Sequence, residues 1–196
     1  MNYPGWRQDL VRSLHVCRSK PEAKYMQVAS VSPAGLPCLR TMVFRRFLDN
    51  SNTLSAVSDC RSDKIKHWQI QPKAELHWYF VKTREQYRLS CDVQILTAQE
   101  DAQSESNQAL ITQAWQQLSK SAQEGFFVPE PKTDKTGNQD GENSVQNISN
   151  QQISPHFALC LFSPYEVDYL DLKTTPHTRV LSELYNSSWQ SKAVNP

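Results

Sequence analysis

The chain has 196 residues, of which 38% are hydrophobic and 10% aromatic, and this composition suits the core of one domain. Its formal net charge of +1 excludes the strong global field that draws many proteins to nucleic acids or membrane surfaces. Five cysteines with no Cys-x-x-Cys pair argue against a disulfide framework and favour reduced thiols in the cytoplasm. Neither a signal peptide nor a run of roughly 18 apolar residues occurs, so we expect one cytoplasmic domain over residues 1–196 with no membrane partner.

Hydrophobic periodicity predicts a helix at the N-terminus, followed by strands and a second helix. Trp6, Leu10 and Leu14 recur every four residues and would form one apolar stripe of the first helix. Pro72 is expected to end the second helix, because the residue before a proline disfavours helical geometry. The elements expected here are a helix over residues 4–16, strands over 25–31, 36–47 and 54–58, a helix over 63–71 and a strand over 74–82.

The clearest strand of the sequence covers residues 86–96, after a short hairpin connection. Apolar and polar residues alternate along it, so one face is expected to be buried and the other to face outward. Gln86, Arg88 and Ser90 share the polar face. These three side chains can therefore act together on a group outside the core.

The second half of the chain alternates between structured and polar stretches. Ile111, Trp115 and Leu118 follow helical spacing and predict one amphipathic helix over residues 105–123. Residues 131–154 are rich in Asn, Gln and Ser and contain too few apolar side chains to offset the entropy of ordering, so we expect a polar loop. Strands are expected again over residues 157–162 and 166–172.

About six strands in hairpin order, with helices between them, favour a mainly β fold with flanking helices. We expect an antiparallel barrel or open sheet and not a parallel array. No Gly-x-Gly-x-x-Gly occurs among the five glycines, which excludes a Rossmann cofactor turn. No metal site is expected, because the pairs His15-x-Cys17 and His156-x3-Cys160 lack further ligands at zinc spacing.

Cations and hydroxyls gather where the strand ending at residue 58 gives way to the next helix. Ser58, Arg61, Ser62 and Lys64 lie in this turn, and the helix that follows offers unpaired N–H groups at its N-terminus. Arg61 and Lys64 are three residues apart, so they face the same way if the turn is helical. Such groups together are what a phosphate requires.

The neighbouring strand adds two further cations. Arg40 and Arg45 bracket Met42 and Val43, whose backbone groups could contact a flat ring. Arg40 and Met42 point to one face, and Arg45 joins them only if the strand bulges or ends between them. The sequence therefore predicts a site for a phosphate-bearing cofactor held against a sheet.

Three short motifs carry a resemblance to one known family. Arg40 to Arg45 is similar to the family's Arg-x-Val-Leu-Leu-Lys strand, and Ser58 to Lys64 to its Thr-x-x-x-Ser-Arg-Lys phosphate turn. Glu85 to Arg88 is similar to its Glu-Arg-Gln-Val-Arg hairpin, shortened by one residue. The chain thus resembles the FMN-binding split-barrel flavoproteins related to pyridoxamine 5'-phosphate oxidase. The likeness covers residues 25–96 well and 157–180 loosely.

This resemblance implies an antiparallel FMN-binding split β-barrel that holds FMN non-covalently in a homodimer, with groups from both subunits at the flavin. It assigns the ribityl phosphate to Arg40, Ser58, Arg61, Ser62 and Lys64. It assigns the flavin ring system to the backbone of Met42 and Val43 and to the side chains of Arg45 and Gln86. Arg88, beside Gln86 on the polar face, completes the predicted cofactor set.

The chain also departs from the oxidase in the residues that grip the vitamin phosphate. The oxidase has Tyr followed by Arg-Pro-x-x-Ser-Gln on its second helix, whereas the corresponding stretch Trp115–Gln123 contains no Arg. Leu170 falls where the family has a stacking Trp, and Arg45 falls where it has a substrate-contacting Lys. We therefore expect a divergent branch of the family in which FMN binding, more than pyridoxamine phosphate oxidation, is retained.

Three functions remain open at this point. The first is a flavin-dependent oxidoreductase acting on an unidentified small molecule, in which the flavin carries the electrons and no catalytic residue is assigned. The second is an FMN-binding or sensing protein without catalysis. The third is a small β-barrel that binds nucleic acid through its basic cluster, and the near-neutral charge argues against it, so we expect no nucleic-acid partner. His67 is expected at the surface.

Overall fold

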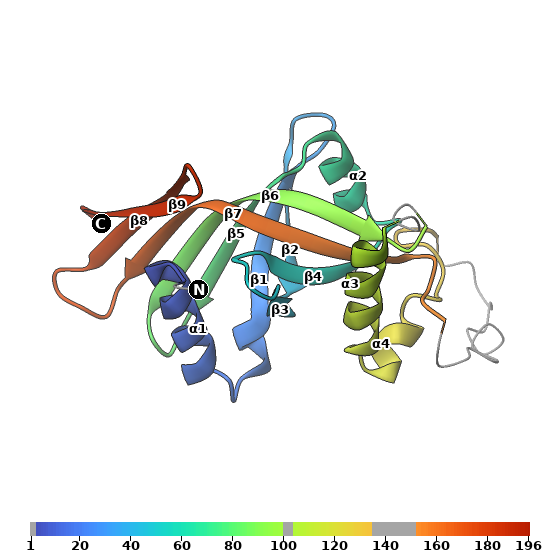
Figure 1. Cartoon of the computed structure of the whole chain (residues 1–196), viewed down its shortest axis with the longest axis horizontal. Coiled ribbons are helices and arrows are strands. Elements are labelled where there is room, and N and C mark those ends of the chain that lie inside the picture. The colour runs from blue at the N-terminus through green and yellow to red at the C-terminus, as the bar shows by residue number, and fades with distance from the viewer. Residues whose placement is uncertain (1–2, 100–103, 135–151) are drawn as a thin grey trace.

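The computed structural model describes residues 3–99, 104–134 and 152–196 (Figure 1). Its elements in chain order are α1 (Gly5–Val16), η1 (Pro21–Lys24), β1 (Tyr25–Val31), β2 (Pro37–Val43), β3 (Arg46–Phe47), β4 (Leu54–Asp59), α2 (Asp63–Ile70), β5 (Lys73–Phe80), β6 (Glu85–Thr97), α3 (Glu105–Gln116), α4 (Lys120–Glu124), β7 (Phe157–Asp171), β8 (Thr178–Tyr185) and β9 (Ser188–Val194). No helix among these described residues is long and apolar enough to cross a membrane.

The strands form one nine-stranded sheet in the order β2-β1-β5-β6-β7-β4-β3, with β8 and β9 added beside β7. Every strand pair of this sheet is antiparallel, so the predicted mainly β, antiparallel fold with flanking helices is confirmed. The β8–β9 hairpin and the helices α3 and α4 lie at opposite ends of the molecule (Figure 1). The polar loop predicted over residues 131–154 lies largely outside the described residues.

The strand predicted over residues 36–47 is interrupted, which corrects the sequence interpretation. Phe44 N donates to Lys24 O at 2.8 Å, and Arg45 N donates to Ser55 O at 2.8 Å. The chain therefore leaves β1 after Val43 and pairs with β4 instead. This change of partner separates Arg45 from the side of β2 that carries Arg40.

The single helix predicted over residues 105–123 is two helices, α3 and α4. Ser119 has extended backbone angles, and its side chain accepts a hydrogen bond from Ala122 N as the N-cap of α4. A capping serine in this conformation begins a new helix and ends the periodicity of the preceding one. Leu118 and Ala122 nevertheless pack in the same apolar cluster as Ile111 and Trp115, which is why the spacing resembled one helix.

The two strands predicted over residues 157–162 and 166–172 are one long strand, β7. Pro164 lies within it, opposite Cys91, where the register of β6 shifts between Ser90 and Cys91. A proline is tolerated in a strand at such an irregularity, because the N–H that it lacks is not required by the ladder there. Strands β8 and β9 were missed because Thr178–Val194 shows little apolar alternation.

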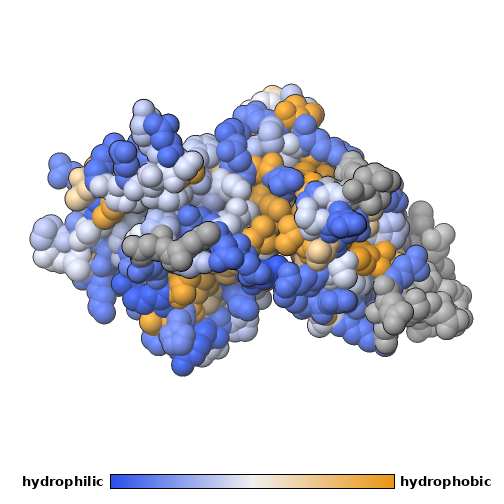
Figure 2. Space-filling view, viewed as in Figure 1, coloured by the Kyte–Doolittle hydropathy of each residue, from blue (hydrophilic) through white to orange (hydrophobic). Residues whose placement is uncertain are grey.

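Two apolar clusters support the sheet. The larger one includes Trp6 and Leu10 of α1, which are buried as the four-residue stripe predicted. The smaller one joins α3 to β7, where the Trp115 and Phe157 rings lie 5.2 Å apart edge to face. Figure 2 shows that hydrophilic side chains cover most of the face in view, with apolar side chains gathered near its middle.

A buried carboxylate fastens α1 to the sheet. Glu85 is only 3% exposed and accepts hydrogen bonds from Ser13 Oγ at 2.6 Å and Tyr169 OH at 2.8 Å. Arg12 Nη2 lies 2.5 Å from the same carboxylate. Burial alone would raise the pKa of Glu85, but these donors lower it below its usual value of 4.5.

We predict that Glu85→Gln lowers the free energy of unfolding by about 1.5–3 kcal/mol at neutral pH, because hydrogen bonds to a buried charge are lost. Since the folded-state pKa lies below 4.5, this contribution is complete above that pH and is lost as the pH falls through the folded-state value. The free energies of unfolding of the wild type and the variant, measured by urea denaturation, should therefore converge in acid. Glu183→Gln, at an exposed ion pair with Lys192, is the control. A gap that persists undiminished in acid would contradict this account.

Candidate functional site

A cavity of about 700 Å³ lies where β4 ends, α2 begins and β2 passes alongside. It is lined by the five residues assigned to a phosphate from the sequence, namely Arg40, Ser58, Arg61, Ser62 and Lys64. The remaining lining residues are Cys38, Leu39, Asp59, Asp63, His67, Pro131 and Lys132. The turn between β4 and α2 places the hydroxyls and Lys64 beside the N-terminus of α2, where unpaired N–H groups favour an anion. We refer to this hollow as the β4–α2 cavity.

Within the described part of the chain, two cations of this cavity form no ion pair. Lys64 Nζ donates to Ser58 Oγ at 3.0 Å, and Arg40 Nη1 donates to Val28 O at 3.0 Å. Neither forms an ion pair with a carboxylate of the described residues. Burial lowers the pKa of both side chains, since partial removal from water disfavours their charged forms. An anionic ligand would restore the charge balance, so this donor set fits a phosphate.

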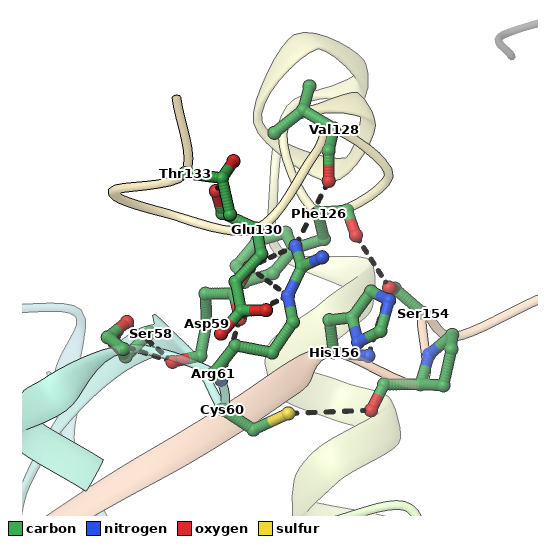
Figure 3. A network of polar contacts seen from close by, with 12 residues as sticks. Ser58, Asp59, Cys60, Arg61, Phe126, Val128, Glu130, Thr133, Ser154 and His156 are labelled. Carbon is green, nitrogen blue, oxygen red and sulfur yellow. Dashed lines mark hydrogen bonds and ion pairs between the residues drawn. The ribbon is translucent and has the colours of Figure 1, made fainter. Parts of the chain in front are cut away.

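Arg61 is held differently from the other cations (Figure 3). Its Nε donates to Asp59 Oδ1 at 3.0 Å, and its Nη2 donates to Asp59 Oδ2 at 2.6 Å and to Val128 O at 3.1 Å. Burial alone would raise the pKa of Asp59, but the hydrogen bonds from Arg61 lower it. These contacts use Nε and Nη2 and leave Nη1 for a ligand. Arg61 thus has a structural role as well, because it links Asp59 to the backbone of Val128.

The residues assigned to the flavin ring do not line the β4–α2 cavity. Met42 is 5% exposed and belongs to the core, as its position on the inner face of β2 requires. Val43 and Arg45 line a second cavity of about 630 Å³, together with Arg18, Lys20 and Lys24. We refer to it as the basic cavity. The structure therefore places the five predicted phosphate residues in one cavity and Val43 and Arg45 in another.

Gln86 and Arg88 lie on the outward face of β6 and line neither cavity. Arg88 forms an ion pair with Asp168 of β7, and the same carboxylate accepts hydrogen bonds from Arg179 Nε at 2.9 Å and Nη2 at 2.6 Å. Burial would raise the pKa of Asp168, but the two guanidinium groups lower it. Asp168 of β7 thus orients one cation on each of two strands that pair with β7.

The lining of the β4–α2 cavity also contains residues that were not assigned to a site from the sequence, among them His67 and Lys132. His67 was expected at the surface but is only 8% exposed, with Nδ1 2.9 Å from Ser30 Oγ. The prediction was wrong because α2 turns this residue toward β1, not toward water. Lys132 lies in the stretch interpreted as a polar loop, and nothing in its local sequence distinguishes it from a solvated lysine.

Comparison with known proteins is consistent with this geometry. Residues 3–97 match the family model described as pyridoxamine 5'-phosphate oxidase, FMN-binding domain. A solved structure from Nostoc punctiforme PCC 73102, a pyridoxamine 5'-phosphate oxidase-related, FMN binding protein, is 36% identical with a TM-score of 0.92, and 100% of each chain is covered.

Two further relatives differ more. The Arabidopsis thaliana protein pyridoxine/pyridoxamine 5'-phosphate oxidase 2 is 29% identical over 194 residues, which cover 97% of this chain and 96% of that protein. The structure of PhzG from Burkholderia lata 383, in complex with tetrahydrophenazine-1-carboxylic acid, is 16% identical with a TM-score of 0.74 over 96% of this chain and 90% of that one. PhzG shares the fold.

We predict that Lys64→Ala weakens the binding of FMN about 10- to 100-fold, the effect of losing one charge-assisted contact to the phosphate. The binding of riboflavin, which has no phosphate, should change little. Fluorescence titration of both flavins into cofactor-free protein measures the two affinities. Lys66→Ala, an exposed lysine on the same helix, is the matched control. Equal losses for FMN and riboflavin would show that Lys64 does not act on the phosphate.

Proposed function

The chain belongs to the pyridoxamine 5'-phosphate oxidase-related, FMN-binding proteins, and on that premise we propose that it is an oxidoreductase acting on a small, negatively charged molecule. FMN is its cofactor and the split β-barrel its fold, as membership of this family implies. When bound, FMN supplies the transfer of hydride or electrons, and the protein supplies binding and orientation. The β4–α2 cavity fits the phosphate of this cofactor, because its Arg40 and Lys64 form no ion pair with a carboxylate of the described residues.

The observation that carries the proposal is the charge of the basic cavity. Four cations line it, and no acidic residue of the described chain does. One of them, Arg45, adjoins Val43, whose backbone we assign to the flavin ring. A hollow with one sign of charge and low-dielectric walls concentrates ligands of the opposite sign. A substrate carrying a carboxylate or phosphate therefore suits this position beside the flavin.

Pyridoxamine 5'-phosphate itself is expected to be a poor substrate. In this chain the stretch Trp115–Gln123, where α3 ends and α4 begins, contains no arginine to hold the vitamin phosphate. The same absence favours a second candidate function, an FMN-binding or sensing protein without turnover. The nucleic-acid alternative has no observation in its favour beyond the cations of the two cavities.

A homodimer is part of the proposal. Gln86 lies on the outward face of the sheet, which also exposes Tyr25 and Tyr79 at 44% and 42%. Exposed aromatic side chains on a sheet face are typical of an interface, and two-fold pairing is the usual arrangement. Such pairing would let Gln86 of one subunit reach a flavin held mainly by the other.

We also propose a cytoplasmic location, in keeping with the free thiols of Cys17, Cys38, Cys91 and Cys160.

The reaction is tested by mixing the FMN-loaded protein with pairs of small reduced molecules that differ only in a phosphate or carboxylate. We expect an anionic member of such a pair to remove the absorbance of oxidised flavin faster than its neutral analogue under anaerobic conditions. This advantage should shrink in Arg45→Gln, because one cation of the basic cavity is lost. Equal rates for charged and neutral members would contradict the anionic substrate. Flavin that no compound reduces would favour the non-catalytic alternative.

A further inference from the structure

One wall of the β4–α2 cavity comes from a segment distant in sequence. Residues 126–133, which follow α4, pass over the end of β4, and Pro131 and Lys132 line the cavity. We refer to these residues as the 126–133 segment. It lies close to Ser58, Asp59 and Arg61 in Figure 3, although almost seventy positions separate the two parts, as in the pair of Arg61 and Val128. Part of the cavity lining therefore depends on long-range contacts that local sequence does not reveal.

Hydrogen bonds hold this segment to other parts of the chain. Arg61 Nη2 donates to Val128 O at 3.1 Å, and the fully buried Ser154 donates from Oγ to Phe126 O at 2.9 Å. Thr133 Oγ1 donates to Glu130 O at 2.8 Å and closes the turn that carries Lys132. These hydrogen bonds therefore fix the backbone that places Lys132 at the cavity.

Lys132 also changes the charge balance of the cavity. Its ammonium group forms an ion pair with Asp63, the first residue of α2. The hydrogen bond from Lys132 lowers the pKa of Asp63 further below neutral pH, so the charged carboxylate is the form that Lys132 offsets. Asp59 is already neutralised by Arg61, whereas an unneutralised Asp63 would repel a phosphate at the same helix end.

We propose that Lys132 is a further cation of the FMN phosphate site, delivered by the 126–133 segment, and that it increases the preference for FMN over riboflavin. This inference rests on the proposed placement of the FMN phosphate in the β4–α2 cavity. Lys132 both offsets the charge of Asp63 and adds a cation to the lining that contains Arg40 and Lys64. A purely structural account, in which the Lys132–Asp63 pair only braces the wall, makes a different prediction.

The two accounts predict different directions of change in FMN affinity for two substitutions. Lys132→Ala should weaken FMN binding about threefold or more, the factor expected from an exposed charge contact, and leave riboflavin binding unchanged. Asp63→Asn removes a negative charge from the lining and should strengthen FMN binding. Both substitutions break the same ion pair, so a bracing role would require both to weaken FMN binding. Fluorescence titration of the full-length cofactor-free protein with FMN and with riboflavin measures each affinity.

Lys66→Ala is the matched control, because it removes an exposed lysine of α2 that does not line the cavity. The effect of Lys132→Ala should also diminish at high salt, as an exposed charge contact does. An unchanged FMN affinity in Lys132→Ala, or a loss in both Lys132→Ala and Asp63→Asn, would overturn the inference. Failure of the wild-type protein to bind FMN would instead overturn the proposed function, and the response of Lys64→Ala shows whether the phosphate site itself is correct.

Discussion

The site depends on one electrostatic constraint at the junction of β4 and α2, where two half-buried cations form no ion pair with any carboxylate that the structure describes. Removing Arg40 and Lys64 partly from water is unfavourable unless another charge compensates them. Serine hydroxyls and the N-terminus of α2 lie around them and cannot supply that charge. A dianionic phosphate can, and this is why the cavity suits the phosphate end of FMN better than a neutral ligand.

The fold keeps this charge imbalance by pairing the other charged groups nearby. Asp59 would neutralise the cavity, but Arg61 takes up its carboxylate and in turn holds the segment over the cavity. At the start of β6, Glu85 is compensated by its own donors and holds α1 to the sheet. Carboxylates are thus committed to structural partners, while Arg40 and Lys64 remain available to a ligand.

Local sequence predicted the parts of this arrangement that depend on local chemistry. The alternation in β6 and the strand-to-helix turn at Ser58–Lys64 are both decided by residues close together, and both were recognised. The continuation of β7 through Pro164 depends on the irregular register of β6, which lies some seventy residues away. The hydrogen bond from Arg61 to Val128 and the position of Lys132 at the cavity likewise depend on distant contacts, so no periodicity or motif predicts them.

Val43 and Arg45 line a different cavity from the predicted phosphate residues for the same reason, because the strand expected to continue to residue 47 changes its partner after Val43. A crystal structure of the protein with FMN tests the central claim most directly. The account predicts the phosphate in the β4–α2 cavity, contacted by Arg40 and Lys64. A phosphate bound instead in the basic cavity, among Arg18, Lys20, Lys24 and Arg45, would contradict it.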